Sequence, residues 1–196
     1  MDKLLPADLF SLEEYHARRP EFRERVLAHK RDRQVALGDN ATLYFEDRLT
    51  IHYQIQEMLR VERIFEADAI AEELAAYNPL IPDGENLKAT FMLEYGDPDE
   101  RRRMLAQLVG VEDRVWIEAD SQSGPERVFA IADEDMERTT QEKTSSVHFL
   151  RFELTSKIRQ AFLEERDVRI GIDHDACRIE KTLHAKSRKA LSADLK

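Results

Sequence analysis

Three consecutive carboxylates, Asp133, Glu134 and Asp135, form the densest charged run that can do chemistry in this sequence. They directly follow a segment with strand character, and adjacent carboxylates repel one another unless a cation, basic groups or water offset their charge. One interpretation is a site for a cation or a basic partner. The alternative is a solvated loop that leads into a helix, since acidic residues favour a helix N-terminus. The calcium-loop pattern is absent, because no glycine follows at the required position.

A second candidate lies on an expected strand over residues 146–154. Strand alternation places His148 on one face with the apolar side chains, and it places Arg151 and Glu153 on the other face. An imidazole can bind a metal or carry a proton, and it also suits a core histidine that is bonded to a neighbour. Arg151 and Glu153 either bind an anion or pair with each other or with charges on a helix.

The third candidate is His174, which stands between Asp173 and Asp175 at the end of the last expected strand. Imidazole and carboxylate ligands suit iron, manganese or zinc better than calcium. Adjacent strand residues point to opposite faces, so a metal site here needs ligands from elsewhere. The remaining acidic and imidazole candidates surround one expected helix and are Glu46, His52, Glu57 and Glu62. The spacing of Glu57 and Arg60 also favours a surface ion pair.

Several known catalytic patterns are absent from the sequence. There is no zincin motif, phosphate loop, nucleophile elbow, dinucleotide fingerprint or pair of Glu-x-x-His motifs. The single cysteine, Cys177, excludes an internal disulfide and a metal site made of cysteines alone.

The elements that must position these residues begin with helices. Ser11 and Glu14 have capping-box spacing, and Pro20 predicts the start of a second helix. Apolar periodicity and turn residues then predict two short strands at 34–37 and 41–46, followed by helices at 48–64 and 67–77.

In the second half of the chain, the sequence predicts mostly short strands with helices between them. Strands are expected at 87–95, 114–118, 127–131, 146–154 and 168–172, with helices from Pro98 to Gly110 and from Thr155 to Glu165. The sequence therefore predicts an α+β fold, with a mostly antiparallel sheet, flanking helices and a helical N-terminal segment. We expect one domain over residues 1–177 and a basic C-terminal tail or helix over 178–196.

The charge balance limits the classes of partner. Forty acidic and thirty basic residues among 196 give a net charge of −10, concentrated in the central part of the chain. A general nucleic-acid binder would carry a basic surface instead. No apolar run reaches the length of a membrane span, and the first residues lack a signal peptide, so a cytoplasmic protein without a membrane partner is expected.

Several stretches together resemble a bacterial family of unknown function. The resemblance covers about residues 1–175, and the segments that carry it are 8–15, 43–46, 53–60, 77–82, 132–135 and 143–153. Members of this family are often encoded beside rubrerythrin-like proteins and iron–sulfur proteins similar to heterodisulfide reductase subunits. The resemblance therefore implies a role in oxidative-stress or electron-transfer metabolism. The Asp175-Ala176-Cys177 corner departs from the family pattern, which has a proline and an aromatic residue there.

The first functional hypothesis is an accessory or interaction protein of a bacterial redox system, without a tightly bound cofactor. Its acidic surface would dock a redox partner through Tyr53, Glu57, Asp133, Glu134, Asp135, Arg151 and Glu153.

Two alternatives stay open. One is a metal-dependent enzyme or metal carrier that holds iron, manganese or zinc through His148 and His174, with Asp133, Asp135 and Glu57 as further ligands. The other is a structural or homo-oligomeric protein in which the strand at 87–95 forms an exposed, interface-forming edge.

Overall fold

Alternating apolar and polar side chains build two antiparallel sheets, whose apolar faces meet in one core. The computed structural model describes residues 2–121, 124–132 and 143–196. The strands are β1 (Gln34–Ala36), β2 (Ala41–Glu46), β3 (Asn86–Leu93), β4 (Val115–Ser121), β5 (Gly124–Phe129), β6 (Ile131–Ala132), β7 (Val147–Glu153), β8 (Val168–His174) and β9 (Cys177–Thr182). Sheet A has the order β1-β2-β3-β7-β6, and sheet B has the order β5-β4-β8-β9. Every pairing is antiparallel, in agreement with the mostly antiparallel sheet that the sequence predicts, but the strands form two sheets and not one.

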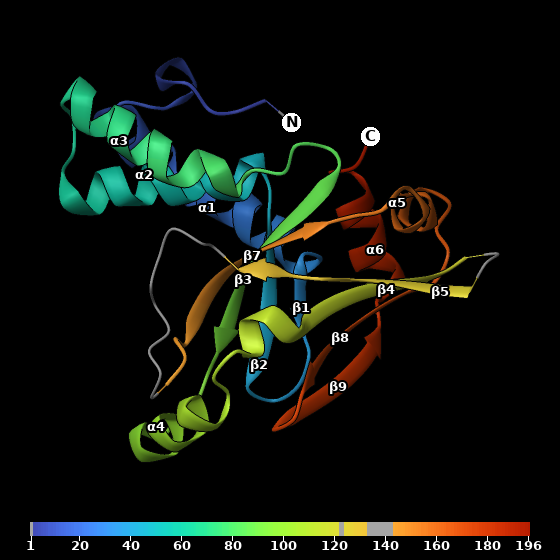
Figure 1. The fold of residues 1–196 in the computed structure, drawn as a ribbon. Helices are drawn as coiled ribbons and strands as arrows, with labels where there is room; N and C mark the ends of the chain where they lie inside the picture. The colour runs from blue at the N-terminus through green and yellow to red at the C-terminus, as the bar shows by residue number, and fades with distance from the viewer. Residues whose placement is uncertain (1, 122–123, 133–142) are drawn as a thin grey trace.

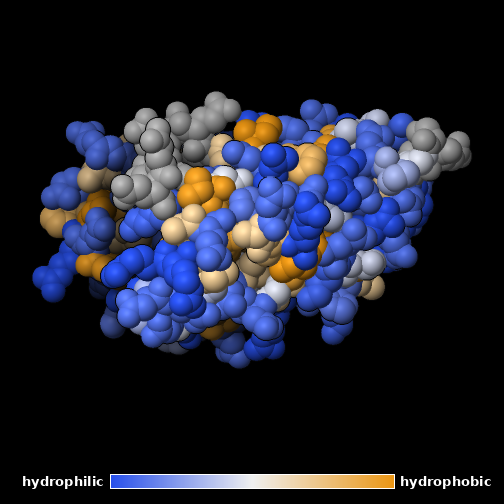
Figure 2. Space-filling model, turned by 60° about the horizontal axis from the view of Figure 1, so that its bottom comes forward, coloured by the Kyte–Doolittle hydropathy of each residue, from blue (hydrophilic) through white to orange (hydrophobic). Residues whose placement is uncertain are grey.

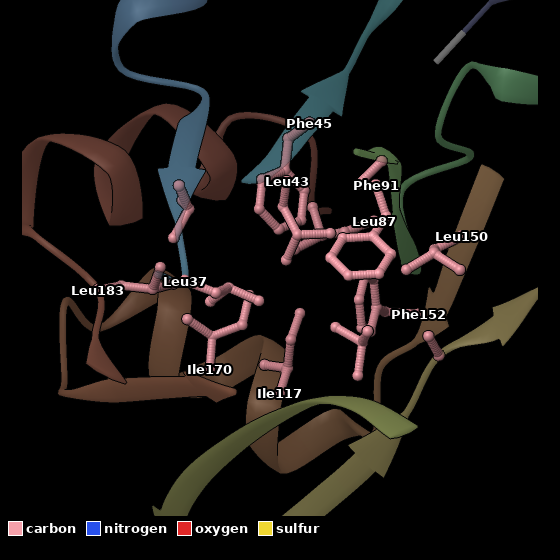
Figure 3. Packing of buried hydrophobic residues seen from close by; sticks show 14 of the residues in the cluster. Leu37, Leu43, Phe45, Leu87, Phe91, Ile117, Leu150, Phe152, Ile170 and Leu183 are labelled. Carbon is pink, nitrogen blue, oxygen red and sulfur yellow. The ribbon is translucent and has the colours of Figure 1, made fainter. Parts of the chain in front are cut away.

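The two sheets face each other across the main hydrophobic core. Figure 3 shows Phe45, Phe91 and Phe152 of sheet A on one side of the core, with Ile117 and Ile170 of sheet B on the other. Burying this apolar surface supplies most of the driving force for folding. On the opposite face of sheet A, the alternation leaves polar and half-buried side chains free to line a site.

The helices cover the sheets unevenly. They are α1 (Leu12–Arg31), α2 (Arg48–Glu62), α3 (Ala67–Tyr77), α4 (Pro98–Gln107), α5 (Ser156–Leu163) and α6 (Ala185–Ser192), with short 3-10 turns η1 (Pro6–Asp8), η2 (Asn78–Leu80) and η3 (Val111–Arg114). Helices α1, α2 and α3 form a layer beside the outer face of sheet A (Figure 1). Helices α5 and α6 pack on the core instead through side chains such as Phe162 and Leu191. No helix in the described ranges is both long and apolar enough to cross a membrane.

Helix α1 corrects the sequence analysis at Pro20. The helix begins after Ser11, whose hydroxyl accepts a hydrogen bond from the Glu14 backbone at 3.2 Å, as the capping pattern predicts. It then runs through Pro20 without a break. The reason lies in packing: Tyr15 before the proline and Phe22 and Val26 after it belong to one buried cluster, which holds both halves in one helix.

The expected strand at 87–95 is not an edge. It forms β3, which pairs with β2 on one side and β7 on the other. The interpretation of this segment as an exposed interface strand is therefore wrong. Its register places Thr90 beside Tyr44 and Phe149 on the outer face of sheet A.

The C-terminal residues 178–196 contribute a strand and a helix. Strand β9 pairs with β8 through residues 177–182, and α6 follows it. Leu191 and Leu195 lie in the main core, and the buried Asp194 forms an ion pair with the buried Arg33. The C-terminal segment thus packs against the N-terminal part of the domain.

Candidate functional site

A cavity of about 370 Å³ lies between the outer face of sheet A and the layer of α1, α2 and α3. This volume falls within the roughly 300–1,000 Å³ of typical small-molecule sites. The lining side chains come from seven elements and are Lys30, Tyr44, Glu46, Ile51, Gln54, Tyr77, Leu80, Thr90, Met92, Val147 and Phe149. Most of the wall is thus apolar or aromatic, and a few polar groups converge on it.

Glu46 is the buried acidic group of this cavity. It ends β2, and its alternation with Phe45 turns its side chain to the outer face of sheet A. One carboxylate oxygen accepts a hydrogen bond from the Thr50 hydroxyl at 2.6 Å, and the other accepts one from the Thr90 hydroxyl at 2.8 Å. These two bonds fix the carboxylate and leave acceptor capacity on both oxygens.

Two lysines near Glu46 are engaged with other groups. The Lys30 ammonium lies 6.0 Å from the centre of the Tyr53 ring, and it lines the same cavity. Lys88 is the cross-strand neighbour of Glu46, but its ammonium donates to the Pro79 carbonyl. Among the described residues, no ion pair offsets the buried Glu46 carboxylate.

A second hollow of about 280 Å³ on sheet B differs from this cavity in its charges. Its Arg127 lies over the Trp116 ring at 3.7 Å and pairs with Glu118 at 2.8 Å. Its Arg178 lies 3.7 Å from Asp173. The charged groups of this hollow thus have partners of opposite charge in it or beside it, unlike those over sheet A.

The predicted site residue Glu57 ties α1 to α2. It accepts hydrogen bonds from the Tyr15 hydroxyl at 2.6 Å, from two Arg19 nitrogens at 2.8 and 3.0 Å, and from Arg60 at 3.1 Å. The bonds from Arg19 and Tyr15 lower the pKa of Glu57 to about 2. Burial and the Glu57 carboxylate together raise the pKa of the Tyr15 phenol. The expected ion pair between Glu57 and Arg60 is present. The additional hydrogen bonds from Tyr15 and Arg19 link Glu57 to α1 as well.

The other predicted residues of this region lie at the borders of the cavity. Tyr53 packs against Phe22 and under the Lys30 ammonium. Arg151 lies two residues beyond Phe149 on the same face of β7, and it pairs with Glu153. Of the two roles considered for these charges, the structure therefore places them in a mutual pair.

His148 lies on the core face of sheet A, as the strand alternation predicts, and its side chain is buried. Its Nε2 lies 3.0 Å from the Thr144 hydroxyl, 2.9 Å from the Ser145 carbonyl oxygen and 3.9 Å from a Glu112 carboxylate oxygen. It is therefore separated from Glu57 by the sheet itself.

His174 engages backbone groups with both ring nitrogens. Nε2 lies 3.1 Å from the Val109 carbonyl oxygen, and Nδ1 accepts a hydrogen bond from the Ala176 backbone at 3.1 Å. Within residues 2–121, 124–132 and 143–196, no three histidine, cysteine or acidic side chains gather as metal ligands do. Asp133, Glu134 and Asp135 lie outside the described residues.

An exposed apolar tip protrudes where α2 turns into α3, at the left edge of Figure 1. We call residues 61–73 the α2–α3 tip. Phe65 is 71% exposed and Val61 is 63% exposed, the two largest values among the exposed large hydrophobic side chains. Arg63, in a left-handed conformation, ends α2 and reverses the chain. The face drawn in Figure 2 is mostly hydrophilic with small hydrophobic patches, one of them at its left edge.

The same tip carries a strong excess of acid. Its five acidic residues and one basic residue are Glu62, Glu66, Asp68, Glu72, Glu73 and Arg63. Burial and the neighbouring Glu62 raise the pKa of Glu73. No ion pair neutralises these carboxylates within the part of the chain that the structure describes.

Sequence reasoning found only part of these features. Glu46 and Glu62 appear among the remaining acidic candidates, but nothing in a linear pattern shows that Glu46 faces a cavity. The sequence does contain a signal for the tip, because Ile64 and Phe65 follow the end of an amphipathic helix and lie between acidic residues. The apolar periodicity by itself predicts only a connection between two helices there.

Comparison with known proteins gives a relative of the same shape. A crystal structure of a novel protein of unknown function from Burkholderia pseudomallei K96243 is 45% identical, covers 100% of both chains and superimposes with a TM-score of 0.92. No curated protein matches the chain. The family model described as Protein of unknown function (DUF3501) matches residues 3–195, which includes the C-terminal strand and helix. The chain therefore belongs to this DUF3501 family.

Proposed function

We propose that the protein is an accessory interaction protein of a bacterial redox or oxidative-stress system. In this proposal it docks a basic partner protein through the α2–α3 tip, and it has no tightly bound cofactor of its own. The exposed Phe65, in the acidic connection between α2 and α3, is the observation that carries the proposal.

The exposed side chains supply the apolar part of such a contact. Phe65 and Val61 keep most of their surface in water, although α2 and α3 bury other apolar residues, such as Leu59 and Leu74, against each other. Burying an exposed phenylalanine in a partner contributes about 1.5–3 kcal/mol. Aromatic residues at the centre of a contact often dominate its affinity.

The surrounding carboxylates supply the selectivity for a basic partner. Four of these carboxylates, Glu62, Glu66, Asp68 and Glu72, are solvent-exposed and lack ion pairs in the described structure. They attract a cationic surface over a Debye length of about 8 Å at physiological salt. Such charges raise association rates and reject acidic partners more than they increase affinity. We therefore expect the complex to weaken as salt increases.

The redox class of the partner rests on the family resemblance. The resemblance implies that genes of this family lie beside those of rubrerythrin-like proteins and of iron–sulfur proteins similar to heterodisulfide reductase subunits. A neighbouring gene is an association and gives no mechanism. It does name two proteins that can be purified and tested directly.

The experiment measures binding of these two purified proteins to the immobilised chain by biolayer interferometry. We expect one of them to bind, and we expect Phe65→Ser to weaken that binding at least tenfold. The matched control is Leu163→Ser, because Leu163 is 52% exposed on α5, away from the tip. It should bind as the wild type does.

Two results would overturn the proposal. One is the failure of both redox proteins to bind at low as well as ordinary salt. The other is equal weakening by Phe65→Ser and Leu163→Ser, which would show that the tip is not the docking surface. Circular dichroism of each variant confirms that it is folded.

A further inference from the structure

We propose that the cavity over sheet A binds a free α-amino acid with an apolar side chain. This inference is independent of partner docking, because the cavity lies between α2 and sheet A rather than at the α2–α3 tip. It rests on three features of the cavity wall: a buried carboxylate, an ammonium group and an apolar surface.

The buried carboxylate of Glu46 calls for a cationic group. Only 9% of the residue is exposed, and its two hydrogen bonds come from neutral threonine hydroxyls. A buried charge without an opposite charge is costly, and an ion pair with good hydrogen bonds offsets part of that cost. An ammonium group bound in the cavity would donate to the free acceptor positions on Glu46.

The ammonium of Lys30 supplies the opposite charge on the same wall. Its nearest described aromatic partner is the Tyr53 ring, 6.0 Å away, and it forms no ion pair with Glu46. Two opposite charges that line one cavity without pairing match a ligand that carries both charges. The ammonium of an amino acid would bind Glu46, and its carboxylate would bind Lys30.

The rest of the wall selects the side chain of the ligand. Met92, Val147 and Phe149 project from sheet A, and Ile51 and Leu80 project from the helical layer opposite. All except the buried Ile51 are half-buried. The exposed apolar surface of these side chains becomes buried when an aliphatic or aromatic side chain fills the cavity. A cavity of about 370 Å³ has room for leucine, methionine or phenylalanine.

The test is isothermal titration calorimetry of the full-length protein with L-leucine, L-methionine and L-phenylalanine. L-phenylalaninamide keeps the ammonium group and loses the carboxylate, whereas N-acetyl-L-phenylalanine keeps the carboxylate and loses the ammonium. We expect at least one free amino acid to bind. If phenylalanine is among them, both of its derivatives should bind at least tenfold more weakly. If leucine or methionine binds instead, the amide and the N-acetyl form of that amino acid take their place.

Variants assign the two charges. Glu46→Gln and Lys30→Met should each weaken binding of the free amino acid at least tenfold. Glu24→Gln, at an exposed position on α1 outside the cavity, is the matched control and should bind normally. Thermal unfolding shows whether each variant retains the fold. Because Lys30 is partly exposed at the end of α1, Lys30→Met tests the proposal even if Glu46→Gln fails to fold.

Three results would overturn the inference. The first is the absence of binding by all three amino acids at millimolar concentration. The second is equal binding of the free amino acid and its amide, which would remove the carboxylate subsite at Lys30. The third is unchanged binding in folded Glu46→Gln. Partner binding in interferometry does not depend on any of these results, so the two proposals fail separately.

Discussion

Glu57 illustrates how a charged residue between two helices becomes structural. Its carboxylate accepts bonds from Tyr15 and Arg19 of α1 and from Arg60 of its own helix. Glu46 is also bonded, but only by hydroxyl groups. The difference in donors separates a carboxylate that holds the fold together from one that is available to a ligand.

Replacing Glu57 with glutamine should change how stability depends on pH. The pKa of Glu57 is about 2 in the folded protein and 4.5 as an isolated side chain, so acid protonates the unfolded chain first. Its contribution is therefore complete above about pH 5, and it is lost as the pH falls from 4.5 toward 2. Glu57→Gln should lower the free energy of unfolding by about 2 kcal/mol at pH 7 and by much less at pH 3.

Urea denaturation at the two pH values measures this difference. The matched control is Glu24→Gln, because Glu24 is exposed on α1. An equal loss for Glu57→Gln at both pH values would contradict the assignment of the tie to the ionised carboxylate.

For these residues, the sequence predicts the local contacts but not the contacts between distant parts of the chain. The face on which His148 lies and the pairing of Glu57 with Arg60 both follow from local periodicity. The additional donors Tyr15 and Arg19 lie 42 and 38 residues from Glu57 along the chain. Nothing in a single sequence indicates contacts over such separations, so the tie between α1 and α2 and the cavity escaped prediction.

For helices and strands, the sequence predicts the boundaries best where the capping residues and the apolar periodicity indicate the same position. The helix at 67–77 is confirmed to the residue, and α2 begins at Arg48 as predicted because Asp47 caps it. Strand β9 was missed because it is an edge strand that alternates half-buried and exposed positions and is rich in charge. The break predicted at Pro20 failed because tertiary packing overrides a local helix breaker.

Pro20 therefore lowers the stability of helix α1. The ring removes one backbone hydrogen bond and crowds the preceding turn. Pro20→Ala should raise the free energy of unfolding by about 1–2 kcal/mol, since part of the gain is lost to the greater freedom of the unfolded chain. Thermal and urea denaturation measure the change.

Arg31→Ala, at an exposed position in the last turn of α1, serves as the control and should change stability by less than about 0.5 kcal/mol. A loss of stability in Pro20→Ala would mean that the proline fits this helix without strain.

At the scale of the whole molecule, Arg33 joins the beginning and the end of the chain. Its guanidinium donates to the Phe45 carbonyl at 3.2 Å, to the Ala190 carbonyl at 3.1 Å and to the buried Asp194 carboxylate. Burial raises the pKa of Asp194 to about 6 against the opposing effect of Arg33. This network anchors α6, so the C-terminal segment is part of the folded unit.

Removal of one partner should cost more than removal of both. Asp194→Ala removes the closer of the two carboxylates that face the buried Arg33, leaving Asp47 at 3.4 Å, and should lower the free energy of unfolding by about 3 kcal/mol. The double variant Arg33→Met with Asp194→Leu should recover at least half of that loss. Urea denaturation of both variants and of each single variant gives the coupling energy. Strictly additive losses would show that the pair does not act as a unit.

Charged side chains are distributed differently at the two ends of the molecule. The net charge is −10, and the α2–α3 tip concentrates five carboxylates around the most exposed large apolar side chain of the described structure. A basic partner would therefore meet this end of the molecule first. The opposite end, built by β4 and β5, instead pairs its charges across the sheet, as Glu118 does with Arg127 and Arg169.

Amide hydrogen exchange in the presence of a bound redox partner tests this claim most directly. We predict that slower exchange on binding is centred on residues 61–73, and that Phe65→Ser removes it while leaving exchange elsewhere unchanged. Slower exchange centred on sheet B or on α5 and α6, with residues 61–73 unaffected, would contradict the assignment of the α2–α3 tip as the docking surface.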